Sequence, residues 1–152
     1  MSFGVDAPIH VYLIPEGERD TRCEMGDEWC IIDGRHFFIR GCLEIPVLDG
    51  PGPFTWIIWS SLSKKNFTRA RELWDIEGRE NEPPYFGWLS NTLPLYPQTL
   101  NLQADVYTRP VGKRPLIKLQ AAPHPLVTEQ QAGVTIKRVQ EIAELLLHPQ
   151  RS

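Results

Sequence analysis

The stretch IIDGRHFFIRGCLEIPVLDGPGPFTWIIWSSLS, residues 31–63, decides how this chain folds. It contains two hydrophobic segments, 35–47 and 54–62, joined by a loop at 48–53 whose Gly and Pro residues favour turns. Asp33 and Gly34, in front of the first segment, form a strong β-hairpin signal. The stretch therefore predicts two neighbouring strands, and a third short strand at 29–32 on the other side of the hairpin turn.

The two hydrophobic segments differ in how their side chains alternate. In 35–47 the odd-numbered positions are mostly apolar, whereas the even-numbered face carries His36, Arg40 and Glu44, so one face is expected to be buried. The segment 54–62 is apolar on both faces, which is typical of an interior strand covered on both sides. Pro46 lacks an N–H, and pairing of the first strand is expected to weaken there.

Along the sequence, one helix is predicted before a second group of strands and two helices are predicted after it. Ser63 is a good N-cap for a helix over 64–75, and an apolar stripe of period 3.6 predicts another over 136–148, capped by Thr135. Short strands are expected near 85–88, 102–109 and 116–120, and a short helix after Pro125 that ends at Gly133. Strands and helices segregate without βαβ alternation, which predicts an α+β fold: an antiparallel sheet with helices 64–75 and 136–148 packed on one face.

The length of 152 residues fits a single domain spanning 1–152, large enough to bury its own core. Residues 1–50 hold 4 basic and 10 acidic side chains, net -6, whereas residues 101–152 hold 7 and 4, net +3. Residues 1–28 are acidic and lack periodicity, so this part is expected to be loosely structured. Residues 29–148 are expected to form the core of the domain.

Composition also bears on partners and on the cellular compartment. No apolar run approaches the roughly 20 residues that span a bilayer, and the N-terminal residues lack the features of a secretory signal. A membrane partner is therefore not expected, and the cytoplasm is the expected compartment. Nucleic acid is an unlikely partner, because the only local basic cluster surrounds a predicted hairpin turn instead of forming an extended basic face. That cluster is Arg109, Lys113, Arg114 and Lys118.

The three cysteines, Cys23, Cys30 and Cys42, have spacings that match no Cys-x-x-Cys pair. An odd number of cysteines argues against a disulfide framework. Together with His36 they have the right chemistry for zinc, but the tight spacing of a zinc knuckle is missing. Buried, inert thiols are the preferred interpretation, and we expect neither a metal site nor a cofactor.

Signatures of common active sites are missing from the chain: it has no GxSxG elbow, no phosphate-binding lysine loop, no GxGxxG and no HExxH. The best candidate for a site is the even-numbered face of the strand 35–47. Residues four apart on a strand are separated by about 13 Å, so His36, Arg40 and Glu44 form no compact dyad by themselves. They would line a groove if neighbouring strands supplied partners such as Asn91. The ordinary alternative, which we favour, is a solvated sheet face with cross-strand ion pairs.

Aromatic residues give a second set of candidates. Five tryptophans are many for this length, and exposed aromatic rings bind ligands or partner proteins. Trp59 and Trp88 are the better candidates for such a role, because the other tryptophans with a readable position fall on stripes that look like core. The candidate binding residues are therefore His36, Arg40, Glu44, Trp59, Trp88, Asn91 and Arg109.

Five blocks of the sequence carry a resemblance to a known family. These blocks are HFFIRGCLEIPV (36–47), FTWIIWSSLSKKNF (54–67), EPPYFGWLSN (82–91), VYTRPVGKRPLI (106–117) and GVTIKRVQEIAELLLH (133–148). Over roughly residues 29–148 the chain resembles DUF2199, a bacterial family without an assigned activity. The resemblance implies a small intracellular bacterial protein and gives no catalytic set to carry over. Members commonly begin with a Cys-x-x-Cys-Gly segment, which this sequence, opening MSFGVDAPIH, lacks; a metal role inherited from the family is therefore in doubt.

Two functions remain open from the sequence. The first is a non-enzymatic binding or interaction module for an unknown protein or small molecule, with a homodimer as a further possibility. The second is an acid–base hydrolase with a cleft lined by His36, Arg40, Glu44 and Arg109. The identity of the ligand or partner, the presence of catalysis and the oligomeric state do not follow from the sequence.

Overall fold

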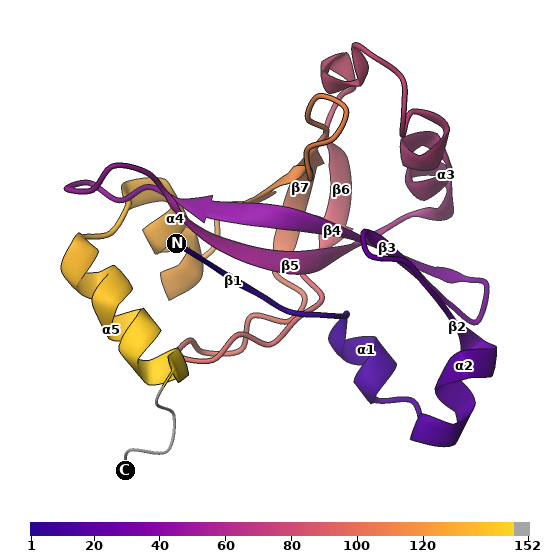
Figure 1. Ribbon diagram of the computed structural model, residues 1–152, viewed down its shortest axis with the longest axis horizontal. Coiled ribbons are helices and arrows are strands. Elements are labelled where there is room, and N and C mark those ends of the chain that lie inside the picture. The colour runs from indigo at the N-terminus through magenta and orange to yellow at the C-terminus, as the bar shows by residue number, and fades with distance from the viewer. Residues whose placement is uncertain (148–152) are drawn as a thin grey trace.

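The computed structural model describes residues 1–147 of the chain and combines helices with a mixed β-sheet (Figure 1). The first half contains β1 (Ser2–Gly4), α1 (Ile9–Tyr12), the 3-10 helix η1 (Glu16–Glu18), α2 (Arg19–Arg22), β2 (Cys23–Met25), β3 (Trp29–Ile32), β4 (His36–Ile45), β5 (Phe54–Leu62) and α3 (Lys64–Glu72). The second half contains η2 (Arg79–Asn81), β6 (Tyr85–Trp88), β7 (Gln103–Tyr107), β8 (Leu116–Leu119), α4 (Pro125–Ala132) and α5 (Ile136–Leu147).

Strands β4 and β5 are the centre of the sheet, as the stretch 31–63 predicts. They pair antiparallel along the whole of β5 and all of β4 except His36, from Phe37 with Leu62 to Ile45 with Phe54. Asp33 and Gly34 both have positive φ angles, 54° and 63°, in the turn between β3 and β4. Asp and Gly are among the residues that adopt this left-handed conformation most readily. The predicted hairpin signal is thus confirmed, and β4 ends at Ile45, one residue before Pro46.

The sheet order is β1-β5-β4-β8-β7-β6, with β3 also pairing with β4 and β2 pairing with β3. Two pairs are parallel: β1 with β5, and β4 with β8 through Cys42 and Leu116. The prediction of an antiparallel sheet is therefore wrong for these two pairs. Both pairs join segments that no short turn connects, so the hairpin signals of the sequence carry no information about them.

The sheet curves until its last strand returns to β5. Leu89, directly after β6, forms a β-bridge with Ser60 of β5, and the N–H of Ser90 donates to the carbonyl of Trp59 over 2.9 Å. A Cβ at Gly87 would collide with the Ser61 carbonyl and the Ser60 hydroxyl. Glycine at this position therefore permits the close approach of β6 to β5.

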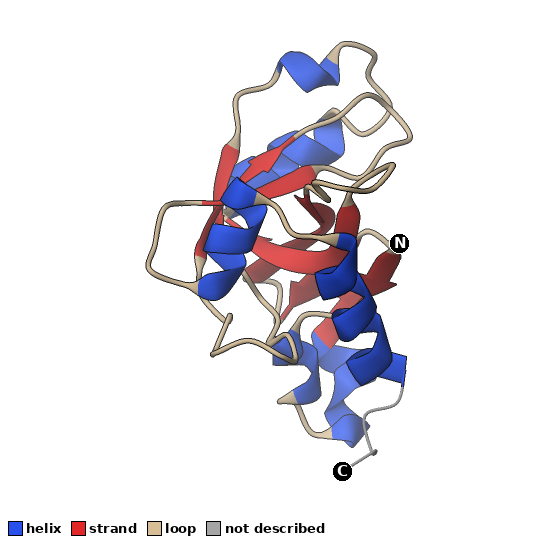
Figure 2. Ribbon diagram, turned by 90° about the vertical axis from the view of Figure 1, so that its left-hand side faces the viewer, coloured by secondary structure: helices blue, strands red, loops and turns tan. Residues whose placement is uncertain are grey.

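Hydrophobic side chains fill both faces of β4 and β5, in accord with the prediction that 54–62 is covered on both sides. The inner cluster contains alternate residues of β3 to β8 together with residues of α3, α4 and α5. The outer cluster, on the opposite strand face, consists of Ile14, Cys30, Ile32, Phe38 and Trp59, with Val11 and Cys23 packed against it. Figure 2 shows the strands in the middle of the molecule with helices around them.

The two long helices both contribute to the inner cluster, α3 through Phe67 and α5 through Ile142, whereas Val11 of α1 packs against the outer cluster. Helix α3 ends at Glu72, three residues before the predicted end at 75. For α5, the predicted end at His148 lies outside the described residues. Between residues 1 and 147, no helix has the length and apolar character of a membrane span.

The acidic segment 1–28 contains β1, α1, η1, α2 and β2, where the sequence predicts mainly loop. The signal for these elements is weak because each is only three or four residues long, too short for an apolar pattern to repeat. Their order comes from contacts with the sheet, notably the parallel pairing of β1 with β5.

Candidate functional site

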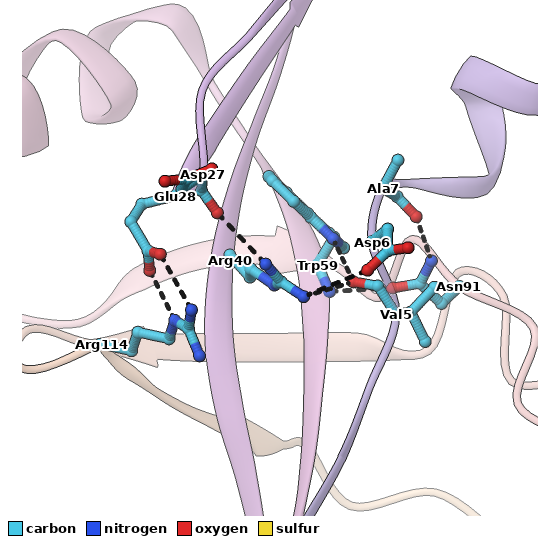
Figure 3. Close-up of polar contacts among 9 residues, drawn as sticks. All are labelled: Val5, Asp6, Ala7, Asp27, Glu28, Arg40, Trp59, Asn91 and Arg114. Carbon is cyan, nitrogen blue, oxygen red and sulfur yellow. Dashed lines mark hydrogen bonds and ion pairs between the residues drawn. The ribbon is translucent and has the colours of Figure 1, made fainter.

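Three of the predicted site residues, Arg40, Trp59 and Asn91, meet on the outer face of the sheet and hold the segment 5–7 (Figure 3). The ring N–H of Trp59 and a guanidinium N–H of Arg40 both donate to the carbonyl of Val5, over 3.0 and 3.1 Å. Trp59 is 0% exposed and packs in the outer cluster. These residues therefore anchor the N-terminal segment to the sheet.

Arg40 lies across the same region. Its guanidinium carbon is 5.6 Å from the Trp59 ring centre, and another N–H donates to the carbonyl of Asp27 over 3.4 Å. Its charge is 4.0 Å from the exposed carboxylate of Asp6. Three chain segments thus converge on one guanidinium, as Figure 3 shows, and its remaining Nε is buried without a hydrogen-bond partner among the described residues.

His36 and Trp88 lie apart from this group. His36 is exposed at the beginning of β4, opposite Ile32 of β3. Trp88 is 42% exposed and stands edge-on to Phe86, with ring centres 5.2 Å apart. The hypothesis of a single cleft lined by His36, Arg40, Glu44 and Arg109 requires these four side chains to converge. The structure brings together Glu44 and Arg109, but it leaves His36 exposed at the beginning of β4 and places Arg40 against the segment 5–7.

Glu44 and Arg109 are brought together, with 3.6 Å between a carboxylate oxygen and a guanidinium nitrogen. The two residues are far apart in sequence. They meet because β4 and β8 lie side by side at the pair Cys42–Leu116. Glu44 lines one pocket of the surface and Arg109 lines another. This ion pair therefore lies where two pockets adjoin.

The pocket beside Arg109, which we call the basic pocket, has a volume of about 570 Å³. It lies between Cys42 of β4, the segment 74–79 and the turn 109–114. Four of its lining residues are basic, Arg79, Arg109, Lys113 and Arg114, and two are acidic, Glu28 and Asp75. Positive charge thus exceeds negative charge on its walls.

Arg79 forms the inner wall of the basic pocket and is only 8% exposed. Its guanidinium donates to the backbone carbonyls of Trp74, Arg109, Pro110 and Lys113, over 2.7 to 3.2 Å. No carboxylate lies within ion-pair distance of it among residues 1–147. Burial of a full charge is costly unless it is paired, and here four carbonyl dipoles and the face of the Trp74 ring, 5.6 Å from the guanidinium carbon, compensate the charge.

Local backbone conformation positions this arginine and the turn that it holds. Gly78 has a φ of 87°, a left-handed conformation that glycine adopts freely, and it precedes the 3-10 helix that begins at Arg79. The turn 110–113 has Gly112 at φ 92° and a hydrogen bond from the Lys113 N–H to the Pro110 carbonyl. These are features of a type II turn, which directs its carbonyls toward Arg79.

The other two arginines of the basic pocket have anionic partners. Arg114 donates two hydrogen bonds to the carboxylate of Glu28, over 2.6 and 3.0 Å (Figure 3), and these bonds raise the pKa of the guanidinium. Arg109 pairs with Glu44 and also donates to the carbonyl of Arg114. Lys113 is exposed and has no ion pair in the described part of the chain. Lys113 is thus the exposed basic group available to an incoming anion, whereas Arg79 has one N–H, on Nη1, beyond the four that already donate to carbonyls.

Cys42 contributes a thiol to the same pocket. Burial raises the pKa of Cys42, and the nearby charges of Arg109 and Arg114 only partly oppose this effect. The thiol therefore stays protonated near neutral pH and is a poor nucleophile. All three cysteines are free, and residues 1–147 contain no group of three His, Cys, Asp or Glu side chains placed to hold a metal ion.

The second pocket, which we call the apolar pocket, has a volume of about 680 Å³. Its walls are the end of β4 with Pro46 and Val47, the loop 50–53, strand β8 and two glutamines of α4. Glu44 and Lys118 are its only charged lining residues. A larger hollow of about 850 Å³ lies beside the first turn of α3, but its ion pair, Arg69 with Glu82, is already formed over 2.9 Å.

Sequence reasoning identified Arg109, Glu44 and the basic cluster around the turn, but it missed Arg79 and Glu28. Arg79 belongs to the stretch 76–84, which reads as a polar connection. Only Gly78, directly before it, marks a special backbone conformation. Glu28 lies at the end of the acidic segment, 86 residues from Arg114, and no spacing rule links the two.

A mixed sheet with helices and a hydrophobic cluster on each face defines this protein as an α+β domain, which carries a basic pocket beside an apolar one. Residues 1–134 match the family model described as "Uncharacterized protein conserved in bacteria (DUF2199)", and the chain belongs to this family. The match begins at residue 1, so it includes the N-terminal segment that the resemblance seen in the sequence leaves out. No curated protein and no solved structure matches the chain.

Proposed function

We propose that this protein is a non-enzymatic binding module whose basic pocket takes a small anionic ligand, such as a carboxylate or a phosphate. The observation that carries the proposal is Arg79, a guanidinium 8% exposed, on the pocket wall, without a carboxylate partner among the described residues. An anion in the pocket would supply the missing negative charge and would accept charge-assisted hydrogen bonds from the ammonium of Lys113 and from the remaining Nη1 N–H of Arg79.

Two further features support binding over catalysis. The protonated Cys42 thiol offers no nucleophile, and neither His36 nor Arg40 lines the basic or the apolar pocket. The basic pocket keeps a surplus of positive charge, because four basic residues line it against two acidic ones, Glu28 and Asp75. We further propose a cytoplasmic setting, for which three free cysteines are the usual state.

The test is a calorimetric titration of inorganic phosphate and of acetate into the wild-type protein and into Lys113→Glu. Lys113 is exposed, so its substitution is expected to leave the fold intact. Charge reversal at a distance of a few ångströms should weaken anion binding by about tenfold or more.

Lys137→Glu is the matched control, because Lys137 is an exposed residue of α5 outside the basic pocket and the change in net charge is the same. Its affinity for anions should stay within about twofold of wild type. If both variants bound anions equally weakly, the loss of affinity would come from the change in net charge and not from the basic pocket. Absence of anion binding to the wild-type protein would refute the proposal.

A further inference from the structure

The basic and apolar pockets adjoin along strands β4 and β8. Cys42 lines the basic pocket and Glu44 the apolar one, two residues apart on the same face of β4. On the neighbouring segment, Arg114, two residues before the start of β8, lines the basic pocket, and Leu116, the first residue of β8, lines the apolar pocket. Two residues of strand measure about 7 Å, so one elongated molecule of modest size can reach from one pocket into the other.

The apolar pocket is an opening built into the sheet. Strands β4 and β8 pair only at Cys42 and Leu116 and then diverge. Beyond this point the edge of β8 is covered by the side-chain amide of Gln130, which donates to the carbonyl of Ile117 and accepts from the N–H of Leu119, over 3.0 and 2.8 Å. The space between the strands is therefore held open while the polar groups of β8 are satisfied.

The β4 side of this opening offers backbone hydrogen-bonding groups. The N–H of Cys42 donates to the carbonyl of Pro115, and in a strand the N–H two residues further on points to the same side. The backbone of Glu44 thus faces the apolar pocket, whereas the N–H of Val134 already donates to the carbonyl of Pro46. A mostly apolar wall with a few polar groups is typical of sites for small organic ligands.

The ion pair of Glu44 and Arg109 separates the two pockets. It spans 3.6 Å, longer than a strong charge-assisted hydrogen bond, and both side chains are partly exposed. Arg109 is therefore placed to leave Glu44 and to pair with an anion that lies between the pockets.

We infer that the ligand of this protein is an amphiphilic anion, whose charged head lies in the basic pocket and whose aliphatic chain lies in the apolar pocket. The inference rests on the proposed anion binding and adds the chain. Charge complementarity selects the head group through Arg79 and Lys113, and burial of the chain against Val47, Pro51 and Leu116 supplies the remaining free energy.

The test measures the affinities of acetate, butanoate, hexanoate and octanoate by calorimetry at one pH and ionic strength. Each methylene buried in the apolar pocket should raise the affinity roughly three- to fourfold. Octyltrimethylammonium has the same chain with the opposite charge, and it should bind at least about tenfold more weakly than octanoate.

Gln131→Trp provides the matching variant, because Gln131 is an exposed residue of α4 on the wall of the apolar pocket and an indole there would occupy the space. The variant should lose the dependence on chain length and keep the affinity for acetate. Gln140→Trp adds the same indole to the exposed side of α5, and it should behave as wild type.

The outcomes separate this inference from the function on which it rests. Affinity that does not change with chain length, but still depends on Lys113, would overturn the amphiphilic ligand and leave anion binding standing. Equal affinity for octanoate and octyltrimethylammonium would overturn the role of the basic pocket for this ligand. Absence of binding for the whole carboxylate series and for phosphate would remove both.

Discussion

One side chain, Asn91, joins three parts of the chain that are far apart in sequence. Its Oδ1 accepts a hydrogen bond from the backbone N–H of Trp59, and its Nδ2 donates to the carbonyl of Ala7, each over 2.9 Å. The residue is 2% exposed. Because water cannot replace these partners in the buried state, the amide is needed to satisfy both backbone groups.

We predict that Asn91→Ala lowers the free energy of unfolding by roughly 2–3 kcal/mol, because it leaves a buried N–H and a buried carbonyl without partners. Urea unfolding followed by tryptophan fluorescence measures the loss. Asn81→Ala, at an exposed position, should change stability by less than about 0.5 kcal/mol. A similar small effect for Asn91→Ala would contradict the anchoring role.

The sequence offers Asn91 as a partner for the even-numbered face of 35–47 and Trp59 as a ligand-facing aromatic residue, and so it assigns both to a ligand site. The structure gives them to the segment 5–7 instead. Residues 1–8 show no period and no motif that predicts where this segment packs. The amide of Asn91 and the ring N–H of Trp59 can form hydrogen bonds equally well with a ligand or with a backbone segment of the protein itself. Arg79 illustrates the same limit, since its four carbonyl partners are backbone groups that any sequence would offer.

Among the secondary-structure elements, β4, β5 and α3 agree most closely with the sequence. Alternation over 35–47, a doubly apolar run over 54–62 and a serine N-cap are strong local signals, and the Ser63 hydroxyl does accept the N–H of Asn66 over 3.1 Å. Local signals of this kind do not predict that β6 packs back against β5. It depends on a close contact between strands 27 residues apart, for which the only local mark is Gly87 in an aromatic strand.

We predict that Gly87→Ala destabilises the protein by about 1–3 kcal/mol, because the added methyl collides with the backbone of Ser61 and forces β6 away from β5. Thermal unfolding measures the shift in Tm. Gly52→Ala is the matched control: a Cβ there meets nothing within 4 Å, and its effect should be close to zero. Equal stability of the two variants would show that the sheet tolerates a wider gap at this point.

At the scale of the whole molecule, the uneven charge of the sequence is balanced by the fold. Residues 1–50 carry a net charge of -6 and residues 101–152 carry +3. Two ion pairs, Glu28 with Arg114 and Glu44 with Arg109, join the segment 1–50 directly to the segment 101–152. Both ion pairs border the basic pocket. Opposite charges at the two ends of a sequence predict attraction, but only the β4–β8 contact decides which residues meet.

The pair Glu28–Arg114 gives the last prediction, because it is the better formed of the two and its side chains are 24% and 33% exposed. A double-mutant cycle with Glu28→Gln and Arg114→Gln should give a coupling free energy of about 1 kcal/mol. The coupling should fall as the salt concentration rises from about 0.1 M to about 1 M, since part of the pair is open to solvent.

The same cycle also bears on the basic pocket. Glu28→Gln frees Arg114, which adds an unpaired positive charge to the wall, and so it should strengthen acetate binding severalfold while it lowers stability. A cycle energy near zero at low salt would show that the contact between the two ends of the chain is held by packing alone. If in addition acetate affinity stayed the same, Arg114 would be too far from the ligand to contribute to its binding.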